Sequence, residues 1–389
     1  MEPLAPGFGD TRAEACYEER VDEELQASLR VAIAHEWLVS YAGSERCVAE
    51  MLRVFPGARL LTTMVEPSAL PAVLRDAQPS LLQHAPGSRR HHEWFLPLMP
   101  LAWRLRAVVR DVDLVISSSH ACAKGVRVEA GTPHLCYCHT PMRYAWHFDD
   151  ERERFPPAIR PFARAGMGWF RRWDRKTAER VTHFVANSSA VARRIEHAFT
   201  RSAQSIHPPV RTGFFTPDGE RDDFFLYVGR LVGYKRPDLV VGAFADLPRH
   251  RLLVVGEGPL GPALAAAATP NVSFLGTVDD ERLRDLYRSA RAFVYPVRED
   301  FGIAMAEAQA CGTPVIGLAD GGATDIVEPG VTGWLVRGQS AGELRAAVGR
   351  AVAEELDAAE IARSAQRFSA ARFRREIGEA AAECAGTAP

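Results

Sequence analysis

The stretch YPVREDFGIAMAEAQACGTPVIGL, residues 295–318, passes from an apolar segment through a charged loop into alanine-rich sequence and then into a second apolar segment. We predict that a strand ends at Pro296 and that a helix runs from near Gly302 to Gly312. Glycine suits the position after a helix because it adopts left-handed backbone angles at no steric cost. The stretch therefore predicts a strand, a helix and a strand in succession, the unit from which parallel sheets are built.

The same alternation of β-rich and helical segments runs through most of the chain. The β-rich segments are apolar almost throughout, which is typical of strands buried on both faces of a parallel sheet. They are VAIAHEWL, ARLLTTM, DLVISSS, PHLCYCH and HFVANSS in the first half and FFLYVGR, RLLVVGEG, VSFLG, AFVYP and PVIGL in the second. The sequence between the two halves is rich in Pro, Gly and Asp and lacks a helical period, which predicts a linker.

We therefore predict an α/β chain with two Rossmann-like parallel-sheet domains facing across a cleft and a C-terminal helical segment. A length of 389 residues also favours two domains over one. The predicted parts are a flexible extension (1–29), an N-terminal domain (30–207), a linker (208–223), a C-terminal domain (224–365), and a helix and tail (366–389) returning toward the N-terminal domain.

The composition is typical of a soluble globular protein, with 47% hydrophobic residues, 25% charged residues and a net charge of -2. This balance predicts no long-range attraction to nucleic acid. The first 29 residues lack the pattern of a signal peptide, and no apolar run is long enough to span a membrane. These features predict a cytoplasmic protein.

The seven cysteines are an odd number, scattered along the chain and often inside apolar segments. This usage indicates reduced thiols rather than a disulfide framework. The sequence CYCH at 136–139 has no second cluster of metal ligands near it. Because Cys136 and Cys138 share one face of a predicted strand, we interpret them as core residues and predict no metal site.

Glu299 and Glu307 lie on either side of the predicted helix start. Glu299 is in the loop before the helix, where free N–H groups of residues such as Gly302 and Ile303 point outward. Glu307 lies one turn beyond Ile303 on the same face. Carboxylates accept paired hydrogen bonds from neighbouring hydroxyls, which suits sugars and riboses. The alternative interpretation is that Glu299 caps the helix and Glu307 faces solvent.

A glycine-rich turn, RLLVVGEGPLGPAL at 251–264, has the spacing of a dinucleotide-binding turn at Gly256, Gly258 and Gly261. However, the following helix is short and interrupted by proline. Asp279, which stands about where a ribose-binding acid is wanted, opens another predicted helix and suits its N-cap. We therefore reject the dinucleotide interpretation.

Arg230 and Lys235 follow the predicted strand FFLYVG in the sequence GRLVGYKR. Arginine makes forked contacts with phosphate oxygens and lysine makes point contacts. Two cations at the end of a strand therefore suit a diphosphate, and the alternative is surface charge beside a helix start.

Taken together, these segments resemble the retaining glycosyltransferases of the GT-B fold, family 4 (glycosyltransferase group 1). REDFGIAMAEAQACGTPVIG resembles their donor segment, with Glu299 and Glu307 as its E-x7-E pair. LYVGRLVGYKRPDLVVGAF resembles their phosphate-binding segment and GGATDIVEPGVTGWLV their closing loop. VAIAHEWL…GSER, DLVISSSHACAKGV, CYCHTPMRYAW, RVTHFVANSSAVARRI and HPPVRTGFF resemble their N-terminal half.

The resemblance is closest to bacterial mannosyltransferase-like members and extends from residue 31 to about residue 375. Three positions depart from the family pattern. Ala42 and Asp300 stand where the family often has Gly, and Asp325 stands where it often has Glu. Because these positions lie in the expected phosphate loop and beside the sugar, donor identity stays open.

The resemblance implies a role for each candidate residue. Arg230 and Lys235 are expected to hold the diphosphate and stabilise it as a leaving group, so that no metal or other cofactor is needed. His139 is expected to contact the transferred sugar, and His35 and Trp37 to line the acceptor side. His139, Glu299, Arg230 and Lys235 form the expected catalytic set. The expected donor-binding residues are Gly43, Gly256, Gly258, Phe301, Gly302, Ile303 and Glu307.

The implied reaction is transfer of a hexose, with its configuration retained, from a nucleotide-diphosphate sugar as co-substrate to an acceptor hydroxyl. GDP-mannose is the first candidate donor, and a bacterial polysaccharide, lipid-linked oligosaccharide or natural product is the expected acceptor. Two alternatives stay open at this stage. One is an epimerase of the same fold acting on a nucleotide sugar, and the other is a non-catalytic protein that binds nucleotide sugars.

The segment HHEWFLPLMPLAWRLRAVVRDVD, residues 91–113, mixes aromatic and basic residues. Such mixtures suit the boundary between water and lipid headgroups. We expect weak peripheral contact with the inner face of the membrane through Trp94, Phe95 and Trp103. Other apolar residues of the segment are expected to pack in the core: Leu98, Leu101 and Leu105. Its prolines exclude one long helix at its start.

Overall fold

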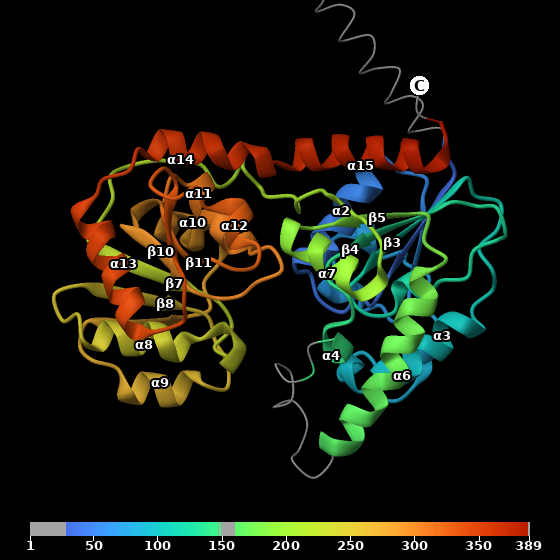
Figure 1. The fold of residues 1–389 in the computed structure, drawn as a ribbon, viewed down its shortest axis with the longest axis horizontal. Helices are drawn as coiled ribbons and strands as arrows, with labels where there is room; N and C mark the ends of the chain where they lie inside the picture. The colour runs from blue at the N-terminus through green and yellow to red at the C-terminus, as the bar shows by residue number, and fades with distance from the viewer. Residues whose placement is uncertain (1–28, 147, 149–159, 388–389) are drawn as a thin grey trace, which may run out of the picture. The chain divides into compact units, whose positions relative to one another are not determined.

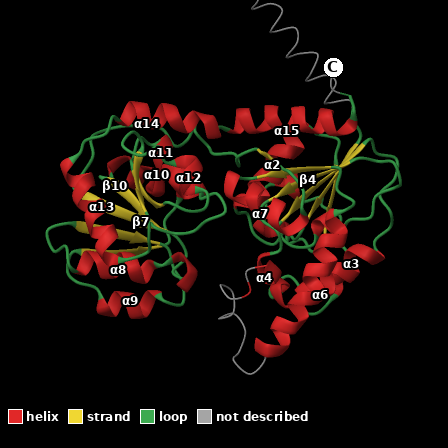
Figure 2. Ribbon diagram, in the orientation of Figure 1, coloured by secondary structure: helices red, strands yellow, loops and turns green. Residues whose placement is uncertain are grey.

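The computed structural model describes residues 29–146, 148 and 160–387 (Figure 1). It contains two six-stranded parallel sheets, with strand orders β2-β1-β3-β4-β5-β6 and β12-β11-β10-β7-β8-β9. Helices flank the strands of each sheet (Figure 2). The predicted α/β class with two parallel sheets and C-terminal helices is therefore confirmed. Residues 1–28 of the predicted extension lie outside the described residues.

The first sheet uses the five predicted strands of the first half and one more. Its strands are β1 (Val31–His35), β2 (Arg59–Thr62), β3 (Leu114–Ser119), β4 (His134–Cys138), β5 (His183–Ala186) and β6 (Gln204–Ser205). Every residue of β1, β3 and β4 is buried, as their continuous apolar sequence predicts. The two residues of β6 are exposed, so that strand has no apolar pattern by which to predict it.

The second sheet is built in the same way around a core of Phe225, Phe293 and Val315. Its strands are β7 (Phe224–Val228), β8 (Arg251–Val255), β9 (Val272–Gly276), β10 (Ala292–Tyr295), β11 (Val315–Leu318) and β12 (Gly333–Val336). Strand β12 falls in a segment that we expected to be a loop. A Cβ at Gly333 would stand 2.0 Å from the Val315 carbonyl oxygen, so glycine lets β12 pair with β11.

Helices alternate with the strands along most of the chain and flank both sheets (Figure 2). The α-helices are α2 (Gly43–Val54), α3 (Met99–Leu105), α4 (Arg143–Trp146), α6 (Arg160–Ala178), α7 (Ser189–Phe199), α8 (Pro237–Ala245), α9 (Gly261–Ala267), α10 (Asp280–Ser289), α11 (Ile303–Ala310), α12 (Ala323–Ile326), α13 (Ala341–Ala353), α14 (Ala358–Ala365) and α15 (Ala370–Ala385). Short 3-10 helices are η1 (Pro67–Ala69), η2 (Ala72–Leu74), η3 (Leu81–His84), η4 (His92–Leu98), η5 (Ala123–Gly125), η8 (Gly233–Lys235) and η9 (Gln366–Phe368). Within the described ranges, no helix is both long and apolar enough to cross a bilayer.

The described residues cluster into two compact units. The first draws on the described residues up to Cys136, on Arg180–His183 and on those from Arg374 onward, and the second on the described residues of 137–179 and on Phe184–Phe373. Within the first unit, Arg374 of α15 donates to the Glu50 carboxylate of α2 at 2.6 Å. The last helix is therefore part of the unit that begins the chain.

The cysteines behave as core residues where the structure describes them. Six are free thiols and all six are buried, whereas Cys16 lies outside the described residues. Cys136 and Cys138 lie in β4 and are at most 1% exposed. The interpretation of Cys136 and Cys138 as core residues is confirmed.

Candidate active site

The glycine-rich turn after β8 packs against the loop after β7. Gly256 has a φ of +118°, and a Cβ on it would stand 2.2 Å from the Gly229 carbonyl oxygen. A Cβ on Gly258 would stand 2.5 Å from the Leu231 carbonyl oxygen. Backbone hydrogen bonds join the two loops at both points. The glycines thus let the loops touch, which fixes the backbone on either side of Arg230.

Asp279 has the role expected of a capping residue. Its carboxylate accepts a hydrogen bond from the Arg282 N–H at 2.8 Å, at the N-terminus of α10. The expected N-cap is confirmed, and the acid is engaged in its own helix. The turn of RLLVVGEGPLGPAL packs at the carboxyl end of β7, and contact of Gly256 and Gly258 with the donor stays a prediction.

Lys235, Tyr295 and Glu299 form a closed triangle at the carboxyl ends of β7 and β10. The Lys235 ammonium lies 2.9 Å from Glu299 Oε1 and donates to the Tyr295 hydroxyl at 2.8 Å. The Tyr295 hydroxyl in turn donates to Glu299 Oε1 at 2.8 Å. The side chains of Lys235 and Glu299 are 19% and 17% exposed, so both charges are sheltered but reach solvent.

Tyr295 keeps its proton in this triangle. Burial, and then the negative charge of Glu299, raises the pKa of Tyr295 well above its usual value. The phenol therefore stays a donor, which fixes the direction of the hydrogen bond to Glu299. Nearby, the Tyr227 hydroxyl donates to the backbone carbonyl of Lys235 at 3.0 Å and holds the end of η8 in place.

Arg230 joins the triangle through Tyr234. The exposed Arg230 guanidinium donates to the Tyr234 hydroxyl at 3.2 Å, and the Lys235 ammonium lies 5.9 Å from the Tyr234 ring centroid. The two predicted cations thus sit on one loop after β7, with an aromatic ring between them. Such an arrangement offers a forked and a point donor to two phosphate groups.

Neither glutamate of the E-x7-E pair has the place that the alternative interpretation predicts. Helix α11 begins after Gly302, which has a φ of +98°, and no side chain caps it, so Glu299 is not a helix cap. Glu307 is 6% exposed and therefore does not face solvent. Phe301 is buried and Ile303 half-buried in the same segment.

The backbone of the loop that carries Glu299 packs against the segment that we predicted to be the closing loop. A Cβ on Gly321 would stand 2.4 Å from the Glu299 carbonyl oxygen, and one on Gly322 would stand 2.2 Å from the Phe301 carbonyl oxygen. The Gly322 N–H also donates to the Glu299 carbonyl oxygen at 2.9 Å. These contacts fix the loop backbone and therefore the direction of the Glu299 side chain.

The predicted residues of the first unit gather at the carboxyl end of β1. His35 is fully buried, with Nδ1 3.1 Å from Ser118 Oγ and Nε2 3.5 Å from Glu45 Oε1. Burial alone would raise the pKa of Glu45, but His35, a backbone hydrogen bond and His120 together lower it to about 2. Trp37 is 8% exposed, and Gly43 is the first residue of α2. His35 and Trp37 are thus enclosed by the chain itself.

His139 follows β4 directly and belongs to the second unit. Its ring is half-buried and lies edge-on to Tyr137 with the ring centroids 5.1 Å apart. The expected placement at the end of a strand is therefore observed, and its contact with a sugar stays a prediction.

Both halves of the chain match families of glycosyltransferases. Residues 41–214 match the family described as Glycosyltransferase Family 4, and residues 214–368 match the family described as Glycosyl transferases group 1. The two matches follow one another without a gap along the chain. The chain belongs to the family 4 glycosyltransferases.

Among the sequence relatives of this family 4 chain are two D-inositol 3-phosphate glycosyltransferases. That of Mycobacterium sp. (strain JLS) is 37% identical over 161 residues, 36% of this chain and 36% of the relative. That of Nocardiopsis dassonvillei is 33% identical over 232 residues, 51% of this chain and 54% of the relative. The chain thus spans about a third to a half of the length of the curated relatives it matches.

Two solved structures share the fold of the family 4 chain. Sucrose-phosphate synthase from Thermosynechococcus elongatus matches with a TM-score of 0.69 and 18% identity, over 92% of this chain and 100% of that chain. Anabaena HepE in complex with UDP matches with a TM-score of 0.65 and 17% identity, over 91% and 100%. At such low identity the likeness shows the fold alone, and it confirms the GT-B fold.

The family 4 chain also uses two residues that the sequence interpretation missed. One is Tyr295, whose hydroxyl completes the triangle described above; its place at the end of β10, four residues before Glu299, was the available signal. The other is Glu36, which is fully buried after β1.

Glu36 organises the loop that follows β3. Its Oε1 accepts the Ser119 hydroxyl at 2.9 Å and three backbone N–H groups, and its Oε2 accepts the Cys122 N–H at 2.7 Å. The three N–H donors to Oε1 are those of His120, Ala121 and Ala123. Burial alone would raise the pKa of Glu36, but the nearby His120 and these amides lower it.

Asp300 and Asp325, two of the positions that depart from the family pattern, each contact donors of the second unit. Asp300 forms ion pairs with Arg143 of α4 and Arg194 of α7. Asp325 accepts a hydrogen bond from the Ser189 N–H at 2.7 Å. Each carboxylate is therefore engaged by the chain's own donors, which the sequence alone did not indicate.

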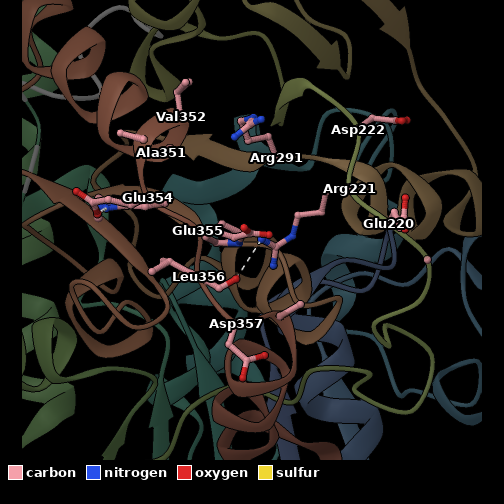
Figure 3. Close-up of a pocket in the computed structure, with 15 residues that line it drawn as sticks. Glu220, Arg221, Asp222, Arg291, Ala351, Val352, Glu354, Glu355, Leu356 and Asp357 are labelled. Atoms are coloured by element: carbon pink, nitrogen blue, oxygen red, sulfur yellow. Dashed lines mark hydrogen bonds between the residues drawn. The ribbon is translucent and has the colours of Figure 1, made fainter.

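A hollow of about 1030 Å³ lies at the opposite end of the second sheet (Figure 3). Asp222, Arg291 and Pro314 line it, each just before β7, β10 or β11. Ligands of open parallel sheets bind beyond the carboxyl ends of the strands. The hollow is at the amino ends, so the triangle of Lys235, Tyr295 and Glu299 is the better candidate site.

Proposed function

We propose that the chain is a retaining, metal-independent glycosyltransferase that moves a hexose from a nucleotide-diphosphate sugar to an acceptor hydroxyl. The observation that supports this most strongly is the triangle of Lys235, Tyr295 and Glu299. It places an ammonium for phosphate beside a carboxylate for sugar hydroxyls, at the strand ends where ligands of this fold bind. The family to which the chain belongs supports the same reaction class.

In the proposed reaction, Arg230 and Lys235 bind the diphosphate and stabilise the negative charge that develops as it leaves. Glu299 accepts hydrogen bonds from sugar hydroxyls, and Glu307 binds a second hydroxyl-bearing part of the donor. Tyr295 holds Lys235 and Glu299 in one geometry. His139 contacts the transferred sugar.

We propose a front-face substitution for the transfer itself. The bond between the anomeric carbon and the phosphate oxygen breaks, and a bond from the acceptor oxygen forms on the same face. The acceptor proton passes to the departing phosphate oxygen. The two cations supply the charge that a metal ion would supply in other enzymes.

GDP-mannose is the first donor that we propose, from the resemblance to mannosyltransferase-like members. UDP-glucose is the second, because a solved structure of the fold-related Anabaena HepE holds it. The acceptor that we propose is a hydroxyl in a bacterial polysaccharide, glycolipid or natural product. We place the protein in the cytoplasm, with weak peripheral contact at the inner face of the membrane.

Nucleotide release from a panel of nucleotide sugars, measured with and without candidate acceptors, tests this proposal. A glycosyltransferase releases nucleotide in an acceptor-dependent way and yields a glycosylated product. An epimerase alters the donor without an acceptor, and a binding protein leaves it intact. Thermal-shift measurements with GDP and UDP identify the base, since a ligand that binds only the folded state raises the melting temperature.

A further inference from the structure

Four large apolar side chains form an exposed stripe on the first unit. It runs along η4 and α3, and its members are Trp94, Leu98, Leu101 and Leu105, which are 77%, 47%, 49% and 64% exposed. The spacings of four, three and four residues place them on one side of a helical path. Helix α3 lies at the periphery of its unit (Figure 1).

The same segment is anchored by its other side, which corrects our expectation for three leucines. Leu96, Met99 and Trp103 are all buried. Trp103, which we expected to be exposed, therefore points into the core, and the leucines that we expected in the core face outward. Within α3, Met99 and Trp103 lie on the buried face, whereas Leu101 and Leu105 lie on the exposed one.

The segment around the stripe is basic, although the whole chain has a net charge of -2. Residues 88–113 contain three acids, Glu93, Asp111 and Asp113, and five arginines: Arg89, Arg90, Arg104, Arg106 and Arg110. All of these arginines except Arg106 are exposed, and Arg106 donates inward to the Thr62 and Gln78 carbonyl oxygens. Arg89 and Arg110 each face one carboxylate but stay 52% and 67% exposed.

We propose that this stripe docks the protein on an anionic lipid surface. Tryptophan and leucine enter the boundary between headgroups and acyl chains, while the flanking arginines contact anionic headgroups. A stable dimer uses about 20 to 30 residues from each partner, many more than the four of the stripe. The surface belongs to the first unit, and the inference rests on the peripheral membrane contact of the proposed function, to which it gives a site.

Co-sedimentation with vesicles tests this surface directly. The full chain is expected to bind vesicles of phosphatidylcholine and phosphatidylglycerol at low salt, to dissociate as salt rises, and to bind pure phosphatidylcholine weakly. Leu98→Ser combined with Leu101→Ser is expected to weaken binding by about tenfold or more, because two leucines no longer bury their side chains. Arg104→Gln combined with Arg110→Gln is expected to weaken binding to anionic vesicles by about tenfold or more.

The matched control is Leu275→Ser combined with Val352→Ser, two apolar side chains of the second unit that are 37% and 39% exposed. This variant is expected to bind vesicles like the wild type. All variants are expected to keep their melting temperature and their thermal shift with nucleotide, which separates failure of docking from failure of the proposed reaction.

Three results would overturn the proposal. The first is the absence of sedimentation with anionic vesicles at low salt. The second is equal binding by the Leu98/Leu101 variant and the wild type. The third is a dimer in light scattering that the Leu98/Leu101 variant abolishes, which would assign the stripe to a second copy of the chain.

Discussion

Glu36 and Glu299 each follow a buried strand, one in each sheet, but their carboxylates are used differently. Glu36 is fully buried, and both of its oxygens accept hydrogen bonds from one loop. Glu299 is 17% exposed and meets Lys235 and Tyr295 through Oε1 alone. Among the described residues, its Oε2 has no hydrogen-bond partner.

We interpret this difference as that between a structural acid, Glu36, and the acid that we propose to bind the donor, Glu299. A buried carboxylate whose oxygens are saturated by backbone amides stabilises a loop, and removing it leaves several buried donors unpaired. A sheltered carboxylate with one oxygen left over can accept a ligand hydroxyl at little cost in stability. Glu36 should therefore control folding, and Glu299 should control catalysis.

Replacing Glu299 with Ala tests the functional side of this comparison. We expect transfer to fall by about 10³-fold or more, since a preorganised contact to the reacting sugar is lost. Steady-state measurement of nucleotide release checks the rate, and thermal unfolding checks that the fold is unchanged. Glu307→Ala should behave alike, whereas Glu307→Gln should keep more activity. Near-wild-type turnover in both alanine variants would show that the donor site lies elsewhere.

Replacing Glu36 with Ala should mainly affect stability. Five donors lose their acceptor, which we expect to destabilise the fold by about 3 kcal/mol. Denaturant unfolding measures this, with Asp76→Ala as the control, because Asp76 is an exposed carboxylate of the same unit. Unfolding of the Glu36 variant at the same denaturant concentration as the wild type would contradict the structural role of Glu36.

Glu45 should make the first unit sensitive to acid. Its pKa in the folded state is about 2, below the unfolded value of 4.5, so its contribution is complete above pH 4.5 and is lost as the pH falls toward 2. We expect this contribution to be about 3 kcal/mol at neutral pH. Glu45→Gln should remove it and flatten stability between these pH values, whereas the exposed Glu220→Gln should not. An unchanged acid profile in the Glu45 variant would contradict the assignment.

Replacing Tyr295 with Phe should have a smaller effect than replacing Glu299. Loss of one hydrogen bond to each partner loosens the triangle, and we expect kcat/KM for the donor to fall by about tenfold. The matched control is Tyr227→Phe, because that hydroxyl bonds the backbone of Lys235 instead of its side chain. Equal losses in the two variants would mean that Tyr295 positions the loop only.

Chelation should have the smallest effect. If Arg230 and Lys235 stabilise the leaving diphosphate, EDTA should leave the rate of transfer unchanged, and the product should keep the α configuration of the donor. Inactivation by EDTA that Mn²⁺ or Mg²⁺ reverses would refute the assigned role of the two cations. An inverted product seen by NMR would refute the retaining mechanism.

The sequence predicted those strands and site residues that depend on patterns within a short segment of the chain. Continuous apolar segments predicted ten of the twelve strands, because burial on both faces of a sheet leaves that pattern. Lys235 and Glu299 were found because each lies in a motif at the end of its own strand. Their contact with each other depends on sheet order, which the sequence did not show.

The role of Glu36 could not be predicted because its donors lie 83 to 87 residues away. Nothing in HEWL indicates which loop will wrap around the carboxylate. The exposure of Leu98 and Leu101 was missed for a different reason. Helix α3 is apolar on two faces, and nothing local shows that the face of Met99 and Trp103, instead of the face of the leucines, meets the core.

The position of α15 has a consequence for synthesis on the ribosome. Glu50 emerges early, but its partner Arg374 is made about 300 residues later. At roughly 5 to 20 residues per second, the first unit waits on the order of 15 to 60 s for its last helix. Ile377 and Ala381, buried in the finished protein, are then still missing. Until α15 is made, the nascent first unit therefore leaves exposed the apolar surface that these side chains cover.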